Sequence, residues 1–154
     1  MPTTSRPASI ALIIGLVASA VATIAPLLDL AATGAIEAHV RDTYPGWDLS
    51  VVTTEAQLIA GWLAITQAVG IFGWLLVLAR YHRSAGGRVA GTVLFTLGAV
   101  TAVLNLTLTF GDYDRIVPTS LGALTLLPVL VGAVALMLQR LHRQADRDAA
   151  VAPR

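Results

Sequence analysis

The sequence contains neither cysteine nor lysine. Without cysteine the chain can form no disulfide bond, and it offers no thiolate for metal binding or redox chemistry. Without lysine, all ten of its basic side chains are arginine. Only 12% of the residues are charged, against about 25% in a typical soluble domain, so the composition does not fit an ordinary water-exposed fold.

The sequence contains four long apolar stretches without Asp, Glu, Lys or Arg. They run from Ile10 to Leu28, from Leu58 to Leu78, from Val89 to Phe110 and from Leu121 to Leu138. A helix needs about 20 apolar residues to cross the hydrocarbon core of a bilayer, and each stretch reaches or approaches this length. We therefore expect an all-α integral membrane protein with spans at about residues 9–32, 56–80, 88–110 and 118–140.

The arginines are distributed unevenly between the two predicted sides of the membrane. Only Arg41 and Arg115 fall in the connections after spans one and three. The other eight are Arg6, Arg80, Arg83, Arg88, Arg140, Arg143, Arg147 and Arg154. Because cytoplasmic flanks retain positive charge, the sequence predicts one up-down-up-down four-helix bundle over residues 1–154, with both termini cytoplasmic and residues 141–154 as a cytoplasmic tail. A short polar connection makes spans three and four antiparallel neighbours.

The first span also has features of a cleavable signal peptide, because Arg6 precedes an apolar run that contains Ala18, Ser19 and Ala20. The apolar region of a signal peptide is about 7 to 15 residues long. Here the apolar run continues past the candidate cleavage site to Leu28. We therefore expect span one to be retained.

Small residues recur at helical spacing along each predicted span. In membranes such residues let helix backbones approach closely, so they indicate the packing faces. The stripes are Gly15, Ser19 and Thr23; Ala60, Ala64 and Ala68; Gly91, Gly98, Ala102, Asn105 and Thr109; and Gly122, Thr125 and Gly132. Pro26 and Pro128 are expected to bend their helices. Thr54 and Gln57 match a capping box, which would mark the start of span two.

A candidate polar pocket consists of the residues Asp29, Gln67, Asn105 and Thr109. Ionisable residues in membrane segments are costly and therefore start as functional candidates. The favoured interpretation of Asp29 is a solvated carboxylate at the outer interface. The alternative is an inward-facing group that lines an outward-open pocket with Asn105 and Thr109. Gln67 and Asn105 are expected mainly to form hydrogen bonds between helices.

The first outer connection carries the candidate interaction residues His39, Arg41, Tyr44 and Trp47. If the first helix continues outward, Ile36, Val40 and Tyr44 share one face, and Glu37 pairs with Arg41 at a spacing of four residues. Tyr44 and the neighbouring tryptophan flank a Pro-Gly turn, and such aromatic residues suit the headgroup level of a bilayer.

No cofactor or metal is expected from the sequence. A metal site can be built from outer-side residues, but the spacing does not require one; its ligands would be Glu37, His39, Asp42 and Glu55. None of the three histidines lies inside a predicted span, so a haem held between facing histidines is excluded. Neither a catalytic Ser/His pair, nor HExxH, nor a P-loop, nor a dinucleotide-binding glycine pattern occurs. We expect neither an enzyme nor a nucleic-acid-binding protein.

Basic residues gather at the predicted cytoplasmic ends of spans two and four. They are Arg80, His82, Arg83, Arg140, His142 and Arg143. A rim of this kind attracts anionic lipid headgroups. We therefore expect the lipid bilayer, with anionic lipids at the cytoplasmic face, to be one partner of the chain.

One segment resembles a known group of proteins. The loop pattern His39, Val40, Arg41, Tyr44, Pro45 and Gly46 is followed by a span with Gly70, Gly73 and Trp74. In residues 35 to 80 the chain is similar to small, functionally uncharacterised four-pass membrane proteins of actinobacteria. The resemblance implies four helices in a bacterial plasma membrane, and it brings no activity or cofactor. The small multidrug transporters also have four short spans, but their central acid falls where this chain has Ala18, Ser19 and Ala20.

The sequence thus favours a non-enzymatic integral protein of the bacterial plasma membrane. It would act as an interaction or accessory component, with a membrane-protein partner or a second copy of itself. The alternative is a small carrier or channel component with an outward-open polar pocket near Asp29 and Asn105. A carrier needs a continuous polar route, and the predicted inner half offers few polar residues for one.

Overall fold

The computed structural model describes residues 6–80 and 86–151. Every named secondary-structure element in this part of the chain is a helix. The elements are α1 (Arg6–Leu28), the π-helix η1 (Asp29–Thr33), α2 (Ala35–Thr43), α3 (Leu49–Arg80), α4 (Gly86–Thr107), α5 (Thr119–Leu124) and α6 (Leu126–Val151). In these residues β-structure is limited to one isolated bridge between Phe110 and Tyr113. The predicted all-α class is therefore confirmed.

Three helical stretches of the described residues are long and apolar enough to cross a membrane: Ile10–Thr33, Leu49–Ala79 and Thr119–Leu138. They correspond to the predicted spans one, two and four. The predicted span at 88–110 corresponds to α4, whose apolar stretch Gly91–Thr107 is shorter. By length and composition the chain is therefore compatible with a multi-pass membrane protein.

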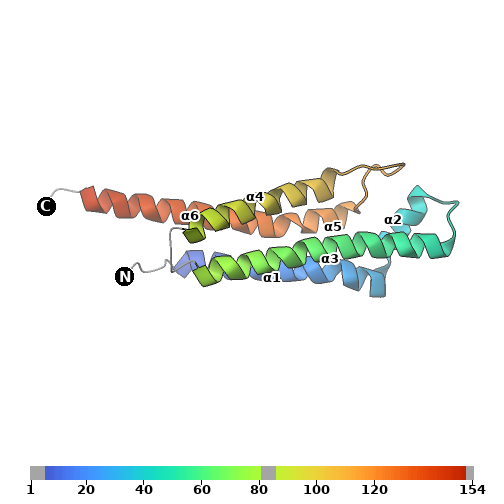
Figure 1. The fold of residues 1–154 in the computed structure, drawn as a ribbon, viewed down its shortest axis with the longest axis horizontal. Coiled ribbons are helices and arrows are strands. Elements are labelled where there is room, and N and C mark those ends of the chain that lie inside the picture. Colours follow the sequence, from blue (N-terminus) through green and yellow to red (C-terminus); the bar gives the residue numbers. More distant parts are fainter. Residues whose placement is uncertain (1–5, 81–85, 152–154) are drawn as a thin grey trace.

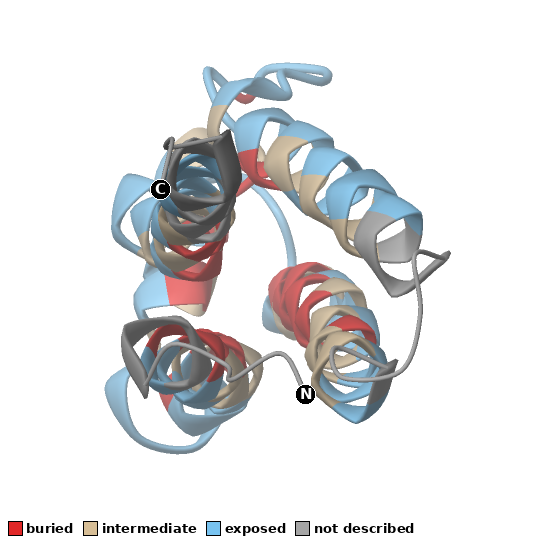
Figure 2. Ribbon diagram, turned by 90° about the vertical axis from the view of Figure 1, so that its left-hand side faces the viewer, coloured by how far each residue is buried: buried red, intermediate tan, exposed pale blue. Residues whose placement is uncertain are grey.

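The long helices run side by side, and α1 begins at the end of the molecule where α6 finishes (Figure 1). α1 packs against α3 and α6, and α4 packs against the same two helices, so the rods close into a ring. Buried residues line the inside of this ring in the end-on view of Figure 2. We call the end where α1 begins and α6 finishes the terminal end. The opposite end carries α2, and we call it the cap end.

Close contacts at two levels along the helix axes show that α4 is antiparallel to α5 and α6. Gly122 lies against Asn105 and Leu106, whereas Gly132 lies against Phe95, so α4 runs opposite to the α5–α6 rod. The expectation for spans three and four is thus confirmed. The rod itself is interrupted between Leu124 and Leu126. Pro128 explains the break, because it has no backbone N–H to donate to the carbonyl of Leu124.

The indole of Trp74 fills the terminal half of the ring. A Cβ added at Gly15 of α1 would overlap the indole. A Cβ added at Gly132 of α6 would lie 3.7 Å from the indole and 2.9 Å from the side chain of Phe95 of α4. Trp74 also packs against a buried cluster formed by Ala11, Leu12 and Ala135. The two glycines are therefore needed because large aromatic rings from α3 and α4 occupy the space that their side chains would take.

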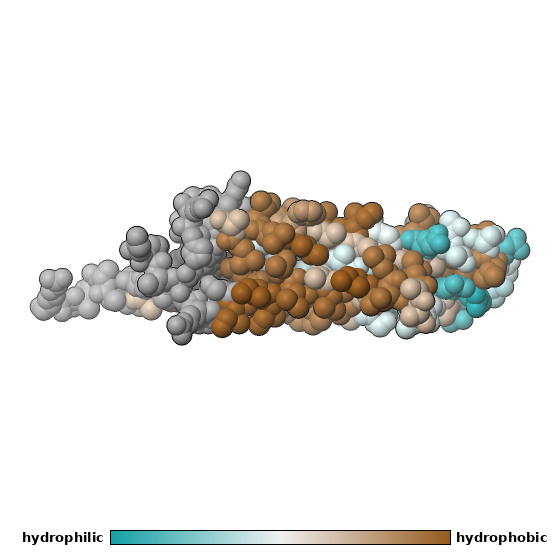
Figure 3. Space-filling model, turned by 90° about the horizontal axis from the view of Figure 1, so that it is seen from below, coloured by the Kyte–Doolittle hydropathy of each residue, from teal (hydrophilic) through white to brown (hydrophobic). Residues whose placement is uncertain are grey.

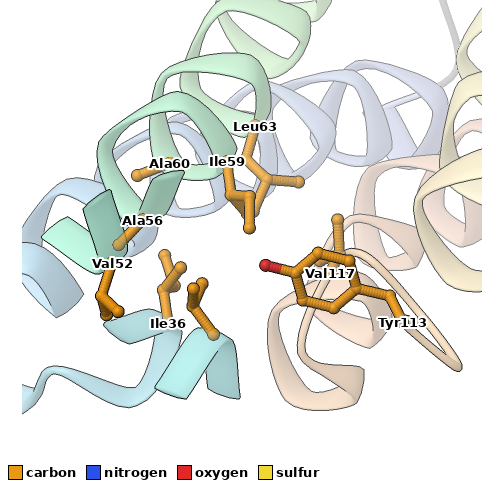
Figure 4. Close-up of a cluster of buried hydrophobic side chains, with 9 residues drawn as sticks. Ile36, Val52, Ala56, Ile59, Ala60, Leu63, Tyr113 and Val117 are labelled. Atoms are coloured by element: carbon orange, nitrogen blue, oxygen red, sulfur yellow. The ribbon is translucent and has the colours of Figure 1, made fainter. Parts of the chain in front are cut away.

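A second buried cluster lies at the cap end, where α2 packs on the first half of α3 (Figure 4). Its members are Ile36, Val40, Val52, Ala56, Ile59, Ala60, Leu63, Tyr113 and Val117. Ile36 and Val40 are fully buried, and Tyr44 packs on the same cluster, so the predicted shared face is confirmed. The structured region at this end comprises residues 34–57 and 108–118, and we call it the cap.

The predicted capping box is wrong. α3 begins at Leu49, and the hydroxyl of Thr54 donates a hydrogen bond to the carbonyl of Ser50 inside the helix, at 2.8 Å. Burial of Val52 and Ala56 against α2 stabilises the additional turns. Tertiary packing therefore starts the helix earlier than the local capping signal indicated.

Large apolar side chains cover much of the outside of the ring (Figure 3). They come from every long helix and include Ile14, Val21, Ile65, Phe72, Leu97 and Leu130, each at least half exposed. Hydrophilic residues gather towards the cap end in the same view. This distribution suits a molecule whose middle is surrounded by lipid.

The packing around Trp74 predicts that a methyl group added at Gly15 destabilises the protein. Gly15→Ala should lower the free energy of unfolding in detergent by about 1–3 kcal/mol, because the new Cβ overlaps the indole. Gly61→Ala is the matched control, since a Cβ there meets nothing within 4 Å. Chemical or thermal unfolding of both variants checks this. Equal stability of the two would show that Trp74 does not lie against α1.

Candidate functional site

Asp29 lies at the junction between α1 and α2 and is only 6% exposed. One carboxylate oxygen accepts a hydrogen bond from the backbone N–H of Ile36 at 2.8 Å. The other accepts one from the backbone N–H of Ala35 at 3.0 Å and one from the hydroxyl of Thr33. The carboxylate therefore caps the N-terminus of α2, where the helix dipole favours a negative charge.

The backbone around Asp29 is shaped for this contact. The chain widens into the π-helix Asp29–Thr33, in which the N–H of Gly34 donates to the carbonyl of Asp29 at 2.8 Å. Gly34 then adopts a left-handed conformation, with φ of 65°, which favours glycine. This turn redirects the chain into α2 and places its first N–H groups over the carboxylate.

The expectation that the Asp29 carboxylate is solvated is therefore wrong. The physical reason is that the chain changes direction at Gly34, so that the first N–H groups of α2 bond to the carboxylate, which the sequence pattern did not reveal. The structure also does not hydrogen-bond Asp29 to the other candidate pocket residues. Thr109 is exposed in the connection after α4 rather than on a buried helix face.

Asn105 and Gln67 are both buried inside the helix ring, at 3% and 7% exposure. The side-chain oxygen of Asn105 accepts a hydrogen bond of 3.0 Å from the indole Nε1 of Trp62. This bond joins α4 to α3, as expected for a polar residue in a membrane helix. The amide nitrogen Nδ2 of Asn105 has no hydrogen-bond partner among the described residues.

Three of the four outer-loop candidates, His39, Tyr44 and Trp47, make aromatic contacts within the cap. The rings of Tyr44 and Trp47 stack at 3.9 Å, and Tyr44 meets Tyr113 edge to face at 5.0 Å. His39 stacks on Tyr113 at 5.6 Å, and its Nε2 bonds to the carbonyl of Arg115 at 2.7 Å. These contacts hold α2 to the connection between α4 and α5.

Two further bonds complete the cap. The backbone N–H of Asp112 donates to the hydroxyl of Tyr44 at 3.1 Å. The predicted pair is confirmed, since Arg41 donates to Glu37 at 2.6 Å on the exposed side of α2. Of the four candidates, Arg41 and Trp47 are exposed, whereas His39 and Tyr44 are half-buried. The first two are thus available to a partner, and the second two hold the cap together.

The surface of the cap combines acidic and apolar side chains. Its acidic residues are Glu37, Asp42, Asp48, Glu55, Asp112 and Asp114, against two arginines, which gives a net charge of −4 with histidine neutral. Phe110 is 76% exposed, and Trp47 and Leu49 are also exposed. The sequence interpretation missed Phe110, because this residue ends an uncharged run and was assigned to span three.

The remaining predicted sites lie partly outside the described residues. His82 and Arg83 are outside the described ranges, and the side chains of Arg80, His142 and Arg143 are not described. Arg140 is exposed on α6. In the part of the chain that is described, no group of three or more His, Asp or Glu side chains is arranged to hold a metal ion.

No family model, no curated protein and no solved structure matches this chain.

The capping contact of Asp29 predicts a local effect of substitution. Asp29→Asn should lower the free energy of unfolding by about 0.5–2 kcal/mol, because a neutral amide interacts less strongly with the helix N-terminus. Backbone amides of α2 should exchange with solvent faster, as measured by hydrogen–deuterium exchange. Asp42→Asn, on the exposed side of the same helix, is the control. Unchanged exchange in the Asp29 variant would refute the capping role.

Burial raises the pKa of Tyr113 to about 12, and the charges of Glu55 and Tyr44 act in the same direction. Because the folded state holds the neutral phenol, its contribution to stability is complete below about pH 10 and is lost as the pH rises to about 12. We expect denaturation experiments between about pH 10 and 12 to show that the free energy of unfolding falls more steeply for the wild type than for Tyr113→Phe. Parallel pH profiles would mean that the phenol is not buried as described.

Proposed function

We propose that this chain is a non-enzymatic, four-span protein of the bacterial plasma membrane and that it acts as an interaction or accessory component through its cap. The observation that carries the proposal is the cap itself. It is a packed region with its own buried cluster, and it presents exposed aromatic side chains within an acidic surface.

The proposed topology has α1, α3, α4 and the α5–α6 rod crossing the bilayer, with both termini in the cytoplasm. The apolar outer surface of the ring and the distribution of arginine support this arrangement. α3 has 32 residues and is about 48 Å long, whereas hydrocarbon is about 30 Å thick. Roughly 18 Å of this helix, on the same two estimates, therefore extends beyond the lipid and supports the cap outside.

Exposed apolar side chains have a different meaning on the cap than on the ring. On the ring they face lipid, whereas Phe110 and Trp47 on the proposed outer surface face water. Exposed apolar groups surrounded by polar residues are typical of protein interaction sites. The net charge of −4 favours a partner with basic residues around an apolar pocket or helix face.

The second candidate function is a small carrier, and one observation favours it. The unpartnered Nδ2 of Asn105 inside the ring offers a hydrogen bond to a solute. Two other observations place it second. Trp74 and Phe95 fill the terminal half of the ring, and the cap cluster around Leu63 and Tyr113 closes the other end. Asp29, the acid that a proton-coupled carrier would use, caps a helix instead.

Two weaker expectations are compatible with the proposed placement. The basic residues at the terminal end, of which Arg140 is described and exposed, would contact anionic lipids of the cytoplasmic leaflet. The resemblance of residues 35 to 80 to small four-pass proteins of actinobacteria would extend the same arrangement to a wider group.

Matched phenylalanine variants test the proposed role of the cap. Phe110 on the cap and Phe72 on the ring are both strongly exposed, at 76% and 68%. The full chain and the variants Phe110→Ser and Phe72→Ser would be purified in mild detergent from the native membrane. We expect a defined protein to be recovered with the wild type and with Phe72→Ser, and to be reduced at least about tenfold with Phe110→Ser, equivalent to about 1.4 kcal/mol.

The unfolding midpoint of each variant serves as the control for folding. If Phe110→Ser is as stable as the wild type and still recovers the same protein in the same amount, the cap is not the interaction surface. Recovery of no protein with the wild type would also contradict the proposed function.

A further inference from the structure

The connection between α4 and α5 presents the most exposed large apolar residue of the described chain. Phe110 is 76% exposed, above the 68% of Phe72 on the outside of the ring. In Figure 1 this connection extends beyond the end of α4 at the cap end of the molecule. Phe110 therefore lies on a projection and not on the flat face of a helix.

Backbone hydrogen bonds fold the projection into a tight turn. The N–H of Tyr113 donates to the carbonyl of Phe110 at 3.2 Å. The N–H of Ile116 donates to the carbonyl of Leu108 at 3.1 Å and closes the base of the turn. We call residues 108–116 the Phe110 turn. The backbone on both sides of its exposed aromatic residue is thus held in place.

The hydroxyl of Tyr44 holds this turn from the side of α2. It accepts a hydrogen bond of 3.1 Å from the backbone N–H of Asp112. At Gly111, where φ is 61°, an added Cβ would lie 2.7 Å from the same hydroxyl oxygen. The ring of Tyr44 is itself fixed, because it stacks on Trp47 at 3.9 Å and meets Tyr113 edge to face. Tyr44 therefore positions the turn through its hydroxyl group.

A fixed backbone lowers the cost of binding through Phe110. A group that is already held in its bound position loses little conformational freedom on association. Aromatic side chains that fill a pocket of the partner dominate the binding energy of many protein interfaces. A projecting phenyl ring on a fixed turn is thus better suited to enter a pocket than to lie on the face of a helix.

The charges next to Phe110 are mainly acidic. Asp112 and Asp114 are exposed, whereas the guanidinium of Arg115 donates a hydrogen bond to the hydroxyl of Thr119 at 2.9 Å. Two carboxylates at the turn attract basic residues at the edge of a pocket. Aromatic side chains that insert into a membrane surface are usually accompanied by Lys or Arg, which the anionic headgroups attract. The charges therefore favour a protein pocket over a lipid surface.

We propose that the Phe110 turn is the anchor of the cap and inserts into an apolar pocket with a basic rim on a partner protein. Tyr44 is the positioning residue, and Asp112 and Asp114 pair with the rim. The inference rests on the function proposed for the cap. It adds which side chain enters the partner, the chemistry of the pocket and the residue that prepares the turn.

A chemically defined mimic of the pocket tests the inference without the natural partner. The probe is a cyclodextrin with amino groups on its rim, which combines an apolar cavity that admits a phenyl ring with positive charge at the edge. The full chain would carry fluorine-labelled phenylalanine in nanodiscs of zwitterionic lipid, so its three phenylalanines give the signals. We expect the probe to shift the signal of Phe110, assigned with Phe110→Ser, and not that of Phe72. A neutral cyclodextrin should bind more weakly, and the difference should shrink at high salt.

Two tyrosine variants test the positioning role. Tyr44→Phe keeps the aromatic ring and loses the bond to Asp112. It should raise the dissociation constant of the probe about fivefold, the typical contribution of one hydrogen bond, and the amide of Asp112 should exchange faster with solvent. Tyr113→Phe is the matched control, because the hydroxyl of Tyr113 is directed into the buried cluster in Figure 4, and both quantities should stay unchanged.

The inference would be overturned if the probe did not shift the signal of Phe110, as expected for a ring buried among lipid headgroups. Equal binding of the charged and neutral cyclodextrins at low salt, or equal effects of the two tyrosine variants, would also overturn it. The function proposed for the cap would survive these results if the recovery of the natural partner still depended on Phe110. Recovery of no protein with the wild type would contradict that function even if the probe bound.

Discussion

The carboxylate of Asp29 and the first N–H groups of α2 form the contact on which the cap depends. Buried charge is costly away from water, and here the helix N-terminus and the hydroxyl of Thr33 compensate it. This contact sets the direction of α2, and the direction of α2 places Ile36 and Val40 on α3. The aromatic contacts of His39 and Tyr44 with the connection after α4 then follow. One acidic side chain thus fixes the cap to the first long helix.

The two halves of the helix ring differ in how they are filled. In the terminal half, Trp74 packs between Gly15 and Gly132, and this contact brings α1, α3 and α6 together. In the cap-end half, the buried side chains of Leu63, Tyr113 and Val117 pack together, and the buried Asn105 accepts a hydrogen bond from Trp62. Large side chains therefore fill the ring towards both of its ends. This packing supports the proposed scaffold over a carrier.

Periodicity and charge in the sequence predicted the helical class, the shared face of Ile36 and Val40, and the pair of Glu37 with Arg41, because these depend on residues near one another in the chain. The environment of Asp29 was not predictable, since it depends on a π-helix and a left-handed glycine that redirect the chain into α2. The start of α3 was misplaced because its first turns are stabilised by α2 rather than by a local cap. The bond between Trp62 and Asn105 depends on neighbouring helices, which no pattern within one span reveals.

In the topology that we propose, the cap lies outside the cell and the terminal end of the bundle faces the cytoplasm. Because the chain has no cysteine, single cysteines can report on each side without background. Asp48→Cys on the cap and Gln144→Cys on α6, both at exposed positions, would be treated in intact cells with a membrane-impermeant thiol reagent. We expect modification of the cap cysteine alone, with the α6 cysteine reacting only after the cells are opened. Modification of Gln144→Cys from outside, or protection of Asp48→Cys, would contradict it.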